Sequence, residues 1–398
     1  MIQRQVYLDT LIRFKDKQLI KVVTGIRRCG KSTLFVLYQD YLRACGVQRE
    51  QIISINLEDG EFDEIESYKQ LYAYVIDMFI PDKMMYVFID EAQRLSEFQK
   101  AIDGLYVKKN CDIYITGSNA YLLSGELATL LSGRYIEIKM LPLSFKEYVS
   151  NFPDNNNYER LYAEYIQNSA FPYSLEIQKP GDRRLYLQSI YDTVVLKDII
   201  SRKKFPDTAM LKSVARFMFD NIGNLCSTKK ISDTMTSAGR KISVHMVENY
   251  LTALIDCFVL YQIGRYDVKG KQYLKTGDKY YAVDIGLRYA LLGPKRSDMG
   301  HILENVVFLE LYRRGYEIFI GKVGNNEVDF IAIGEEGEEY YQVAHSVVDA
   351  EGKALRRELA PLEAVRDHNP KYLLTMDNTP LTSHNGIKQI NALDWLLK

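Results

Sequence analysis

The chain has 398 residues and a formal net charge of −1 at pH 7, so no overall positive field marks it as a nucleic-acid-binding protein. Its 47% hydrophobic and 26% charged residues are ordinary for a water-soluble globular protein of two or three domains. The five cysteines form no C-x-x-C pair, which argues against a disulfide framework or a zinc site and favours a reducing, cytoplasmic location. No apolar run approaches a membrane span and no signal-peptide core is present, so we expect no membrane partner.

The strongest motif lies near the amino end, after an amphipathic stretch at residues 6–14 that we expect to pack on the first strand. A short apolar run at residues 19–23 leads into residues 25–32, GIRRCGKS, and a helical pattern follows. This is a G-x-x-x-x-G-K-S phosphate loop (P-loop) in its required context. Its glycines let backbone N–H groups surround phosphate oxygens, and the helix dipole adds positive charge. We expect Lys31 to reach the β- and γ-phosphates of ATP and Ser32 to bind Mg²⁺. The residues expected to hold the nucleotide are Gly25, Arg28, Cys29, Gly30, Lys31, Ser32 and Thr33.

A second motif follows a strand expected at residues 52–57 and a helix expected at residues 68–79. Residues 84–91, MMYVFIDE, predict a buried strand that ends in two acidic residues. We expect Asp90 to hold Mg²⁺, directly or through water, and Glu91 to polarise the attacking water as a general base. An acidic pair at this place can also merely cap the next helix, but the phosphate loop upstream favours the catalytic interpretation.

The next expected strand, at residues 111–116, is followed by Gly117 and then by Ser118 and Asn119. A polar residue at the end of the strand beside the acidic pair can contact the γ-phosphate and the attacking water. Ser118 and Asn119 are therefore candidate catalytic residues.

Arg134 lies between a helix expected at residues 121–131 and a strand expected at residues 135–140. In ring-forming ATPases an arginine at this place projects into the nucleotide site of a neighbouring subunit, a role that suits its permanent, forked charge. The alternative is an arginine that satisfies the carboxyl end of a helix. The alternation of strands and helices over residues 1–150 predicts a parallel sheet covered on both faces.

Five segments carry a family resemblance: GIRRCGKST, YVFIDEAQRL, YITGSNAYLL, LSGRY and MLPLSFKEYV. Together they resemble the AAA+ ATPases of the archaeal-type ATPase family, and the resemblance extends over nearly the whole chain. It implies an ATPase module followed by a nuclease-like C-terminal domain of unknown function. The residues to which it gives functional roles are Gly30, Lys31, Ser32, Asp90, Glu91 and Arg134. A ring or partial ring of subunits follows if Arg134 acts on a neighbouring copy.

A polar, turn-rich break at residues 151–157, NFPDNNN, ends the first domain. We expect residues 151–204 to form a helical lid over the nucleotide. Arg183 and Arg184 are available to contact the γ-phosphate, and the alternative is a solvated pair.

Residues 205–290 predict a winged helix, in which three helices precede a hairpin. The expected elements are helices at 209–222 and 229–236, a third helix capped by Ser243, and strands at 258–265 and 279–283. The third helix could enter a DNA major groove. The residues that could neutralise DNA phosphates are Arg240, Lys241, Lys269, Lys271, Lys275 and Lys279. Acidic residues interrupt this basic set, so the alternative is a protein-docking module.

Residues 291–398 have the layout of a restriction-endonuclease-like α/β domain. In such folds carboxylates on a helix and two strands bind Mg²⁺ while a lysine helps to activate water. Glu304 and Asp329 match, but Gln342 and Ala344 stand where the third carboxylate and the lysine would be. We therefore expect a nuclease-like remnant that lacks cleavage activity. The later expected elements are a helix at 353–363, a strand at 372–375 and a terminal helix at 387–397.

The leading hypothesis is a Mg²⁺-dependent ATPase that acts on or with DNA through its winged-helix and nuclease-like domains. One alternative is an ATP-gated protein-docking switch without DNA contact. Another is an ATP-gated, metal-dependent nuclease that uses Glu304 and Asp329. Stimulation of ATP turnover by DNA separates the first two, and cleavage of DNA in Mg²⁺ or Mn²⁺ tests the third.

Overall fold

The computed structural model describes residues 2–123, 131, 133–200, 205, 207–268, 270, 272–293 and 298–398, without the side chains of residues 121, 123, 195–197, 275 and 276. The chain divides into two compact units. The first comprises residues 1–142 and 256–258, and the second comprises residues 143–255 and 259–398. No helix among these described residues is long and apolar enough to cross a bilayer.

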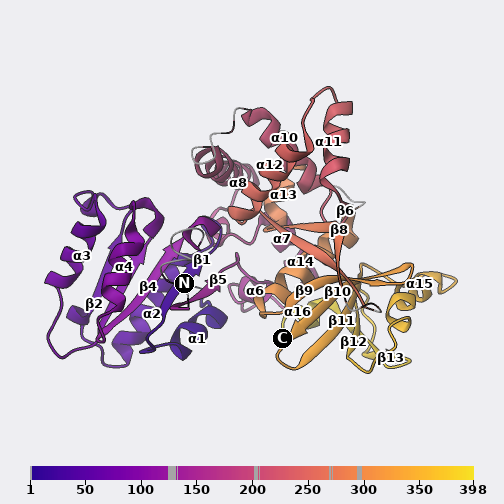
Figure 1. Cartoon of the computed structure of the whole chain (residues 1–398). Helices are drawn as coiled ribbons and strands as arrows, with labels where there is room; N and C mark the ends of the chain where they lie inside the picture. The colour runs from indigo at the N-terminus through magenta and orange to yellow at the C-terminus, as the bar shows by residue number, and fades with distance from the viewer. Residues whose placement is uncertain are drawn as a thin grey trace. The chain divides into compact units, whose positions relative to one another are not determined.

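The first unit is built on a parallel five-stranded sheet with the strand order β2-β3-β4-β1-β5 (Figure 1). Its strands are β1 (Ile20–Thr24), β2 (Ile52–Asn56), β3 (Met85–Asp90), β4 (Cys111–Gly117) and β5 (Tyr135–Lys139). The predicted parallel sheet is confirmed. Each predicted strand is present because its apolar run is short and bounded by polar or turn residues.

Helices cover both faces of this sheet (Figure 1). The main helices are α1 (Gln5–Arg13), α2 (Lys31–Ala44), α3 (Tyr68–Asp77) and α4 (Phe98–Tyr106), with short turns η1 (Arg49–Gln51), η2 (Gly60–Phe62), η3 (Ala92–Arg94) and η4 (Ala120–Leu123). One face of the sheet packs aliphatic side chains such as Val87 and Ile115 against α3 and α4. The alternate positions face α2 with aromatic rings, and Phe88 stacks on Tyr114 with ring centroids 4.7 Å apart.

Helix α1 packs against α2, and the expectation that residues 6–14 also lie on the first strand stays a prediction. Tyr7 and Leu11 are the buried residues of α1, whereas Val6 is 51% exposed. The apolar face of the helix is buried, as expected, and α2 is one of the elements that it contacts.

The second unit begins with a run of helices, and side chains cap the first turns of several of them. The helices are α6 (Phe145–Val149), α7 (Tyr158–Asn168), η5 (Pro172–Glu176), α8 (Pro180–Asp192), η6 (Thr193–Ile200), α10 (Thr208–Asp220), α11 (Thr228–Ser237), α12 (Val244–Asp256) and α13 (Ile285–Leu292). Ser144 and Glu147 form a reciprocal capping box at α6, and Ser227 caps α11. The η6 segment is a π-helix that continues from α8.

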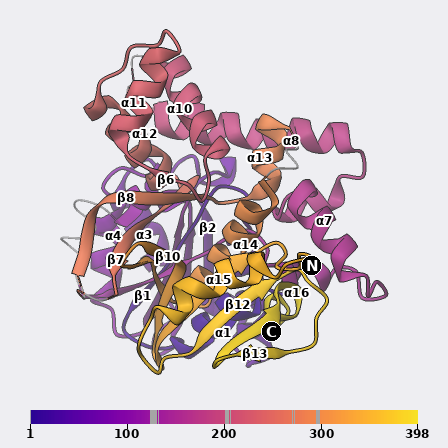
Figure 2. The ribbon, with the colours of Figure 1, turned by 90° about the vertical axis from the view of Figure 1, so that its right-hand side faces the viewer.

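A nine-stranded mixed sheet forms the rest of the second unit, with the order β13-β14-β12-β11-β10-β9-β7-β8-β6. Its strands are β6 (Leu225–Cys226), β7 (Leu260–Asp267), β8 (Gln272–Ala282), β9 (Glu317–Val323), β10 (Asn326–Gly334), β11 (Gly337–Ala344), β12 (Lys371–Thr375), β13 (Thr382–His384) and β14 (Ile387–Asn391). Helix α15 (Lys353–Glu363) covers one face over β10, β11 and β12 (Figure 2). Helices α14 (Met299–Arg313) and α16 (Ala392–Leu396) pack on the same sheet, where the Trp395 ring of α16 meets the Tyr341 ring of β11.

Two expectations for this unit are corrected. The hairpin expected as a wing is longer, and β7 pairs in parallel with β9 at residues 265–267, so both of its strands belong to the larger sheet. The helix expected at residues 387–397 begins only at Ala392, because the preceding residues form β14 beside β12. The side chains of Ile387 and Gln389 are buried while Lys388 is exposed, which is the two-residue period of a strand. The division into a lid, a winged helix and an endonuclease-like domain at residues 151–204, 205–290 and 291–398 stays a prediction.

Candidate functional site

The candidate site lies at the carboxyl ends of β1, β3 and β4. These ends are adjacent because β4 lies between β1 and β3 in the parallel sheet. The crevice at the carboxyl edge of such a sheet is where ligands bind. The phosphate loop leaves β1, Asp90 and Glu91 end β3, and Ser118 and Asn119 follow β4. The structure therefore brings together these three sequence motifs.

The phosphate loop has a backbone that its glycines make possible. Gly30 has a φ of 104°, and Arg28 also adopts a positive φ of 68°. A Cβ on Gly25 would lie 2.1 Å from the carbonyl oxygen of Met140, so a larger residue would not fit there. Cys29 is buried, and this burial raises the pKa of its thiol, which keeps it neutral. Ser32 and Thr33 are exposed in the first turn of α2.

Lys31 is the first residue of α2, and its side chain turns back into the loop. Its Nζ donates hydrogen bonds to the carbonyl oxygens of Gly25 at 3.0 Å and Ile26 at 3.3 Å. The same Nζ lies 3.7 Å from Oε1 of Glu91. A buried ammonium group thus stands between the phosphate loop and the end of β3.

Asp90 is buried at the end of β3, where the hydroxyls of Ser32 and Thr116 donate hydrogen bonds to it. Burial raises the pKa of this carboxyl, and the two hydroxyl contacts oppose the shift. A serine hydroxyl beside a carboxylate is a donor set that suits Mg²⁺ when phosphate oxygens complete the coordination. The residues expected to hold the metal therefore fit it.

Glu91 has a left-handed backbone with a φ of 54°, which is unusual for a residue other than glycine. Its N–H donates to Oγ1 of Thr116 at 2.9 Å. Its Oε2 accepts a hydrogen bond of 2.5 Å from Nε2 of Gln93, which also donates to Oγ of Ser118 at 3.2 Å. Such strained backbones concentrate at functional sites. Sequence reasoning missed Gln93, although its position two residues after Glu91 was a signal.

Asn119 is fully buried, and neither polar atom of its side-chain amide has a hydrogen-bond partner among the described residues. A buried amide without partners costs about 1–3 kcal/mol for each unsatisfied group. Because Asn119 lies two residues after the end of β4, this cost is located at the edge of the sheet that carries the phosphate loop and the acidic pair. Unpaired polar groups at such a place indicate a site for a polar ligand.

Arg134 lies at the opposite edge of the sheet. Its carbonyl accepts from the N–H of Ile20, the first residue of β1, so roughly five residues of strand, about 16 Å, separate it from the phosphate loop. Its guanidinium pairs with Asp103 at 2.5 Å and lies over the Tyr106 ring at 5.3 Å. Arg134 therefore does not belong to the constellation formed by the loop of its own chain.

The structure describes the side chains of only some of the expected DNA-contacting residues. Arg240 and Lys241 are both exposed, and the guanidinium of Arg240 bonds to the side chain of Ser213 on α10. Lys269 and Lys271 lie outside the described residues, as does the side chain of Lys275. Lys279 is buried, so the expectation that it neutralises DNA phosphates is wrong.

Lys279 instead enters a cluster of carboxylates in the second unit. Its Nζ lies 2.8 Å from Oε1 of Glu304, 3.0 Å from Oε1 of Glu327 and 3.7 Å from Oδ1 of Asp329. Burial disfavours the charged forms of both Lys279 and Glu304. The neighbouring carboxylates nevertheless raise the pKa of Lys279, and Lys279 and the other hydrogen-bond donors lower the pKa of Glu304. Burial and the charge of Glu304 raise the pKa of Asp329 to about 7. The hydroxyl of Tyr281 also donates to Oε1 of Glu304 at 2.6 Å.

Gln342 belongs to the same cluster as a structural link. Its Oε1 accepts from the N–H of Asp329 at 3.3 Å, and its Nε2 donates to Oε2 of Glu358 at 3.0 Å. Although position 344 is an alanine, Lys279 of β8 brings an ammonium group to Glu304 and Asp329. Across the described part of the chain, no three His, Cys, Asp or Glu side chains are arranged to hold a metal ion.

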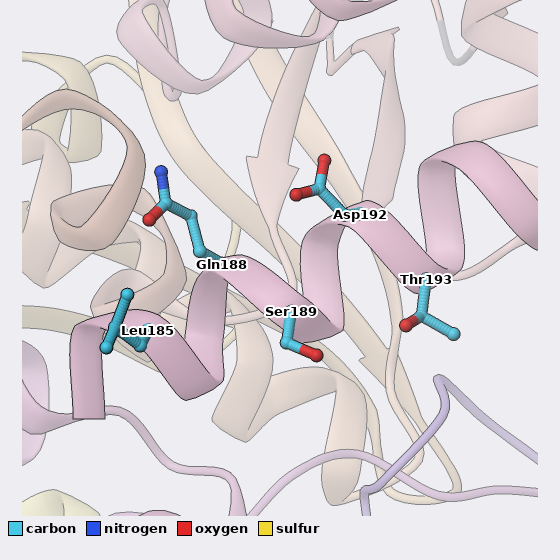
Figure 3. Close-up of a pocket in the computed structure, with 5 residues that line it drawn as sticks. All are labelled: Leu185, Gln188, Ser189, Asp192 and Thr193. Carbon is cyan, nitrogen blue, oxygen red and sulfur yellow. The ribbon is translucent and has the colours of Figure 1, made fainter. Parts of the chain in front are cut away.

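A pocket lies along α8 (Figure 3). It is lined by Leu185, Gln188, Ser189, Asp192 and Thr193. The carboxylate of Asp192 pairs with Lys212 at 3.0 Å, and Leu185 is 65% exposed. On the same helix, Arg183 donates to Oδ1 of Asn168 at 2.8 Å, so its guanidinium serves packing within the helical region. This pocket has no group arranged for chemistry among its five lining residues.

Comparison with known proteins assigns a family to two parts of the chain. Residues 17–149 match a family described as an AAA domain, and residues 159–298 match a domain of unknown function, DUF8612. An uncharacterized protein of Haemophilus influenzae is 41% identical over 403 residues, which cover 100% of this chain and 99% of that protein. An uncharacterized protein of Methanocaldococcus jannaschii is 29% identical over 380 residues, which cover 91% of this chain and 81% of that protein.

Solved structures are more distant. A Walker-type ATPase of Pyrococcus abyssi aligns with a TM-score of 0.49 and 15% identity over 73% of this chain and 96% of that chain. The ORC1 protein of Aeropyrum pernix, in complex with DNA, aligns with a TM-score of 0.33 and 11% identity over 73% of this chain and 92% of that chain.

Proposed function

Because the chain belongs to the same protein family as its Haemophilus influenzae relative and contains an AAA domain, we propose that it is an ATPase that binds ATP with Mg²⁺ and hydrolyses it to ADP and phosphate. The observation that carries the proposal is the buried amide of Asn119, which lacks a partner among the described residues and lies beside the phosphate loop. A γ-phosphate oxygen and the attacking water would satisfy its donor and its acceptor. This explains why a costly, unpaired amide is kept at this place.

The proposed binding step uses the loop and the first turn of α2. The backbone N–H groups of residues 25–30 surround the phosphates, and Lys31 turns its ammonium from the Gly25 and Ile26 carbonyls to the β- and γ-phosphates. Ser32 and Asp90 hold Mg²⁺. When bound, this ion would neutralise the negative charge that develops on the phosphate oxygens.

The proposed hydrolytic step uses the ends of β3 and β4. Glu91 accepts a proton from the attacking water, whose oxygen then bonds to the γ-phosphorus as the bond to the bridging oxygen of ADP breaks. Asn119 orients the water and the γ-phosphate. Ser118 supports this arrangement through its hydrogen bond from Gln93. Water access is limited because these side chains are buried.

A simple experiment tests this function. Phosphate release from ATP is measured in Mg²⁺ for the wild type, Lys31→Ala and Glu91→Gln. We expect Lys31→Ala to abolish nucleotide binding, while Glu91→Gln binds ATP and turns it over at least ~100-fold more slowly, since a general base contributes about that much. Normal turnover by Glu91→Gln would remove Glu91 from the proposed role.

Fewer observations support action on DNA than support ATP hydrolysis. In the helical region Arg240 and Lys241 are exposed, but the Arg240 guanidinium bonds to Ser213 of α10 and the exposed side of α12 carries Glu248. These observations favour the second candidate function, an ATP-gated protein-docking switch. ATP turnover with single-stranded, double-stranded and branched DNA, at low and moderate salt, decides between them. Stimulation that fades with salt supports action on DNA, and unchanged turnover supports docking.

We also propose roles for the second unit and for Arg134. A lid over residues 151–204 and a winged helix over residues 205–290 would transmit the nucleotide state to a restriction-endonuclease-like domain over residues 291–398. Lys279 supports a domain without cleavage activity, since its ammonium fills the centre where a catalytic metal ion would bind. Self-association into a ring or partial ring follows if Arg134, which lies away from the phosphate loop of its own chain, acts on the loop of a second copy.

A further inference from the structure

Gln93 makes the contacts that hold the carboxylate of Glu91. Its Nε2 donates to Oε2 of Glu91 at 2.5 Å and to Oγ of Ser118 at 3.2 Å, which uses both amide hydrogens. Gln93 thus joins the end of β3 to the end of β4. It also leaves Oε1 as the oxygen of Glu91 that is not held by an amide.

The other oxygen of Glu91 faces Lys31. Oε1 lies 3.7 Å from Nζ of Lys31, beyond hydrogen-bond distance. Once Lys31 binds phosphates, Oε1 is the oxygen that remains to accept a proton. A carboxylate fixed through one oxygen presents the other in a defined direction, and this orientation is what a general base needs.

Stability does not explain a glutamine at this position. Its Oε1 is buried and has no hydrogen-bond partner among the described residues, and it lies where a Cβ on Gly117 would be only 3.0 Å away. A buried, unpaired carbonyl oxygen destabilises the folded chain by about 1–3 kcal/mol. An apolar side chain of the same length would avoid this cost. We therefore attribute the amide at this position to the hydrogen bonds that its Nε2 donates to Glu91 and Ser118.

We infer that Gln93 is a positioning residue for ATP hydrolysis, which fixes Oε2 of Glu91 through its amide and directs Oε1 towards the attacking water. The inference rests on the proposed function, because it assigns Gln93 a role through Glu91. It predicts that Gln93 affects turnover and leaves nucleotide affinity unchanged.

The test uses Gln93→Met, which keeps the length of the side chain and removes both hydrogen-bonding groups. We expect kcat to fall roughly 10- to 100-fold, a part of the general-base contribution, while KM for ATP and the thermal midpoint stay within error or the midpoint rises. The matched control is Gln39→Met on α2, whose amide bonds to Ser54 at 3.2 Å and which we expect to be neutral. A second variant, Gln93→Glu, replaces the donor with a carboxylate and should lower kcat at least as much.

A double-mutant comparison isolates the link to Glu91. In the Glu91→Gln background, Gln93→Met should cause no further loss of turnover, because the carboxylate that it positions is gone. A lower thermal midpoint with unchanged kcat would make Gln93 merely structural and overturn the inference. Turnover that survives Glu91→Gln would instead overturn the proposed function, so the two failures are distinguishable.

Discussion

Arg4 donates a hydrogen bond of 2.8 Å from Nη1 to the carbonyl oxygen of Cys29, at the centre of the phosphate loop. Its Nη2 donates to the carbonyl oxygen of Leu141 at 2.6 Å, after the last strand of the first unit. The guanidinium is only 2% exposed and also lies over the Tyr7 ring, with its carbon 5.0 Å from the ring centroid. A residue close to the amino end of the chain therefore fixes the conformation of the loop.

Replacing Arg4 with methionine tests this connection. The change leaves the carbonyls of Cys29 and Leu141 without their donor, which costs about 1–3 kcal/mol for each buried group. We expect a lower thermal midpoint without ligand and weaker ATP binding, because the loop is no longer fixed. Thermal denaturation with and without Mg²⁺-ATP measures both effects. Arg13→Met is the control, because Arg13 is exposed at the end of α1, the helix that Arg4 precedes, and an equal effect of the two changes would contradict the role of Arg4.

Asn119→Leu is expected to separate stability from activity. Leucine is apolar and close in size, so it removes two buried amide atoms that lack partners among the described residues. We expect the free energy of unfolding without nucleotide to be unchanged or up to ~2 kcal/mol higher. Turnover should fall because no amide orients the γ-phosphate and the water. Denaturant unfolding and phosphate release test the two effects, and a variant with lower stability and normal turnover would show that the amide is structural.

Arg134 should act only on a different copy of the chain, since it lies at the sheet edge opposite its own phosphate loop. We expect Arg134→Ala alone and Glu91→Gln alone to have little turnover. A mixture of the two should recover activity, because the Glu91→Gln copy supplies Arg134 to the intact loop of the other. Turnover is measured as the mixing ratio is varied. No recovery in a mixture that light scattering shows to be associated would leave Arg134 as the partner of Asp103 alone.

The sequence was sufficient for the parts of this molecule that depend on local patterns. The five parallel strands and the positions of Asp90, Glu91, Ser118 and Asn119 followed from apolar runs with polar residues at their ends, and the position of Lys31 followed from the G-x-x-x-x-G-K-S motif. Contacts between distant segments were not predictable in this way. The link from Arg4 to Cys29 spans 25 residues and that to Leu141 spans 137, and neither leaves a local trace.

Lys279 shows how the same reasoning failed. A lysine among other lysines is normally a solvated residue, and the strand pattern around it gave no reason to bury it. Its burial depends on Glu304, 25 residues later, and on Glu327 and Asp329 of β10. The β-bulge between Val328 and Ile331 that helps to aim Asp329 was equally invisible in the sequence. Gln93 was not predicted because a glutamine has no ionisable group, and the catalytic candidates after β3 were chosen among acidic residues.

Lys279→Met is expected to destabilise the second unit. It removes the ammonium from between three carboxylates, and an uncompensated buried charge costs about 3–5 kcal/mol. We expect a clear drop in the thermal midpoint, with Lys353→Met, which is 74% exposed, as the unaffected control. Adding Glu304→Gln should recover part of the loss, since it removes one of the carboxylates left without a counter-charge. Equal midpoints for Lys279→Met and the wild type would mean that the cluster does not stabilise the fold.

Asp329 makes the stability of the second unit depend on pH. Burial and the charge of Glu304 raise its pKa from the ordinary 3.8 to about 7 in the folded chain. Between these values the folded state binds more protons than the unfolded state, so this residue makes stability fall as pH rises from about 4 to 7. Asp329→Asn cannot ionise and should lose this part of the dependence. We therefore expect the thermal midpoint of Asp329→Asn, relative to that of the wild type, to increase from pH 5 to pH 8.

His301 also makes stability fall as pH rises, because its contact with Glu304 raises its pKa. This contribution is present in both proteins, so the difference between their midpoints isolates Asp329. Parallel pH curves would show that Asp329 stays ionised beside Lys279.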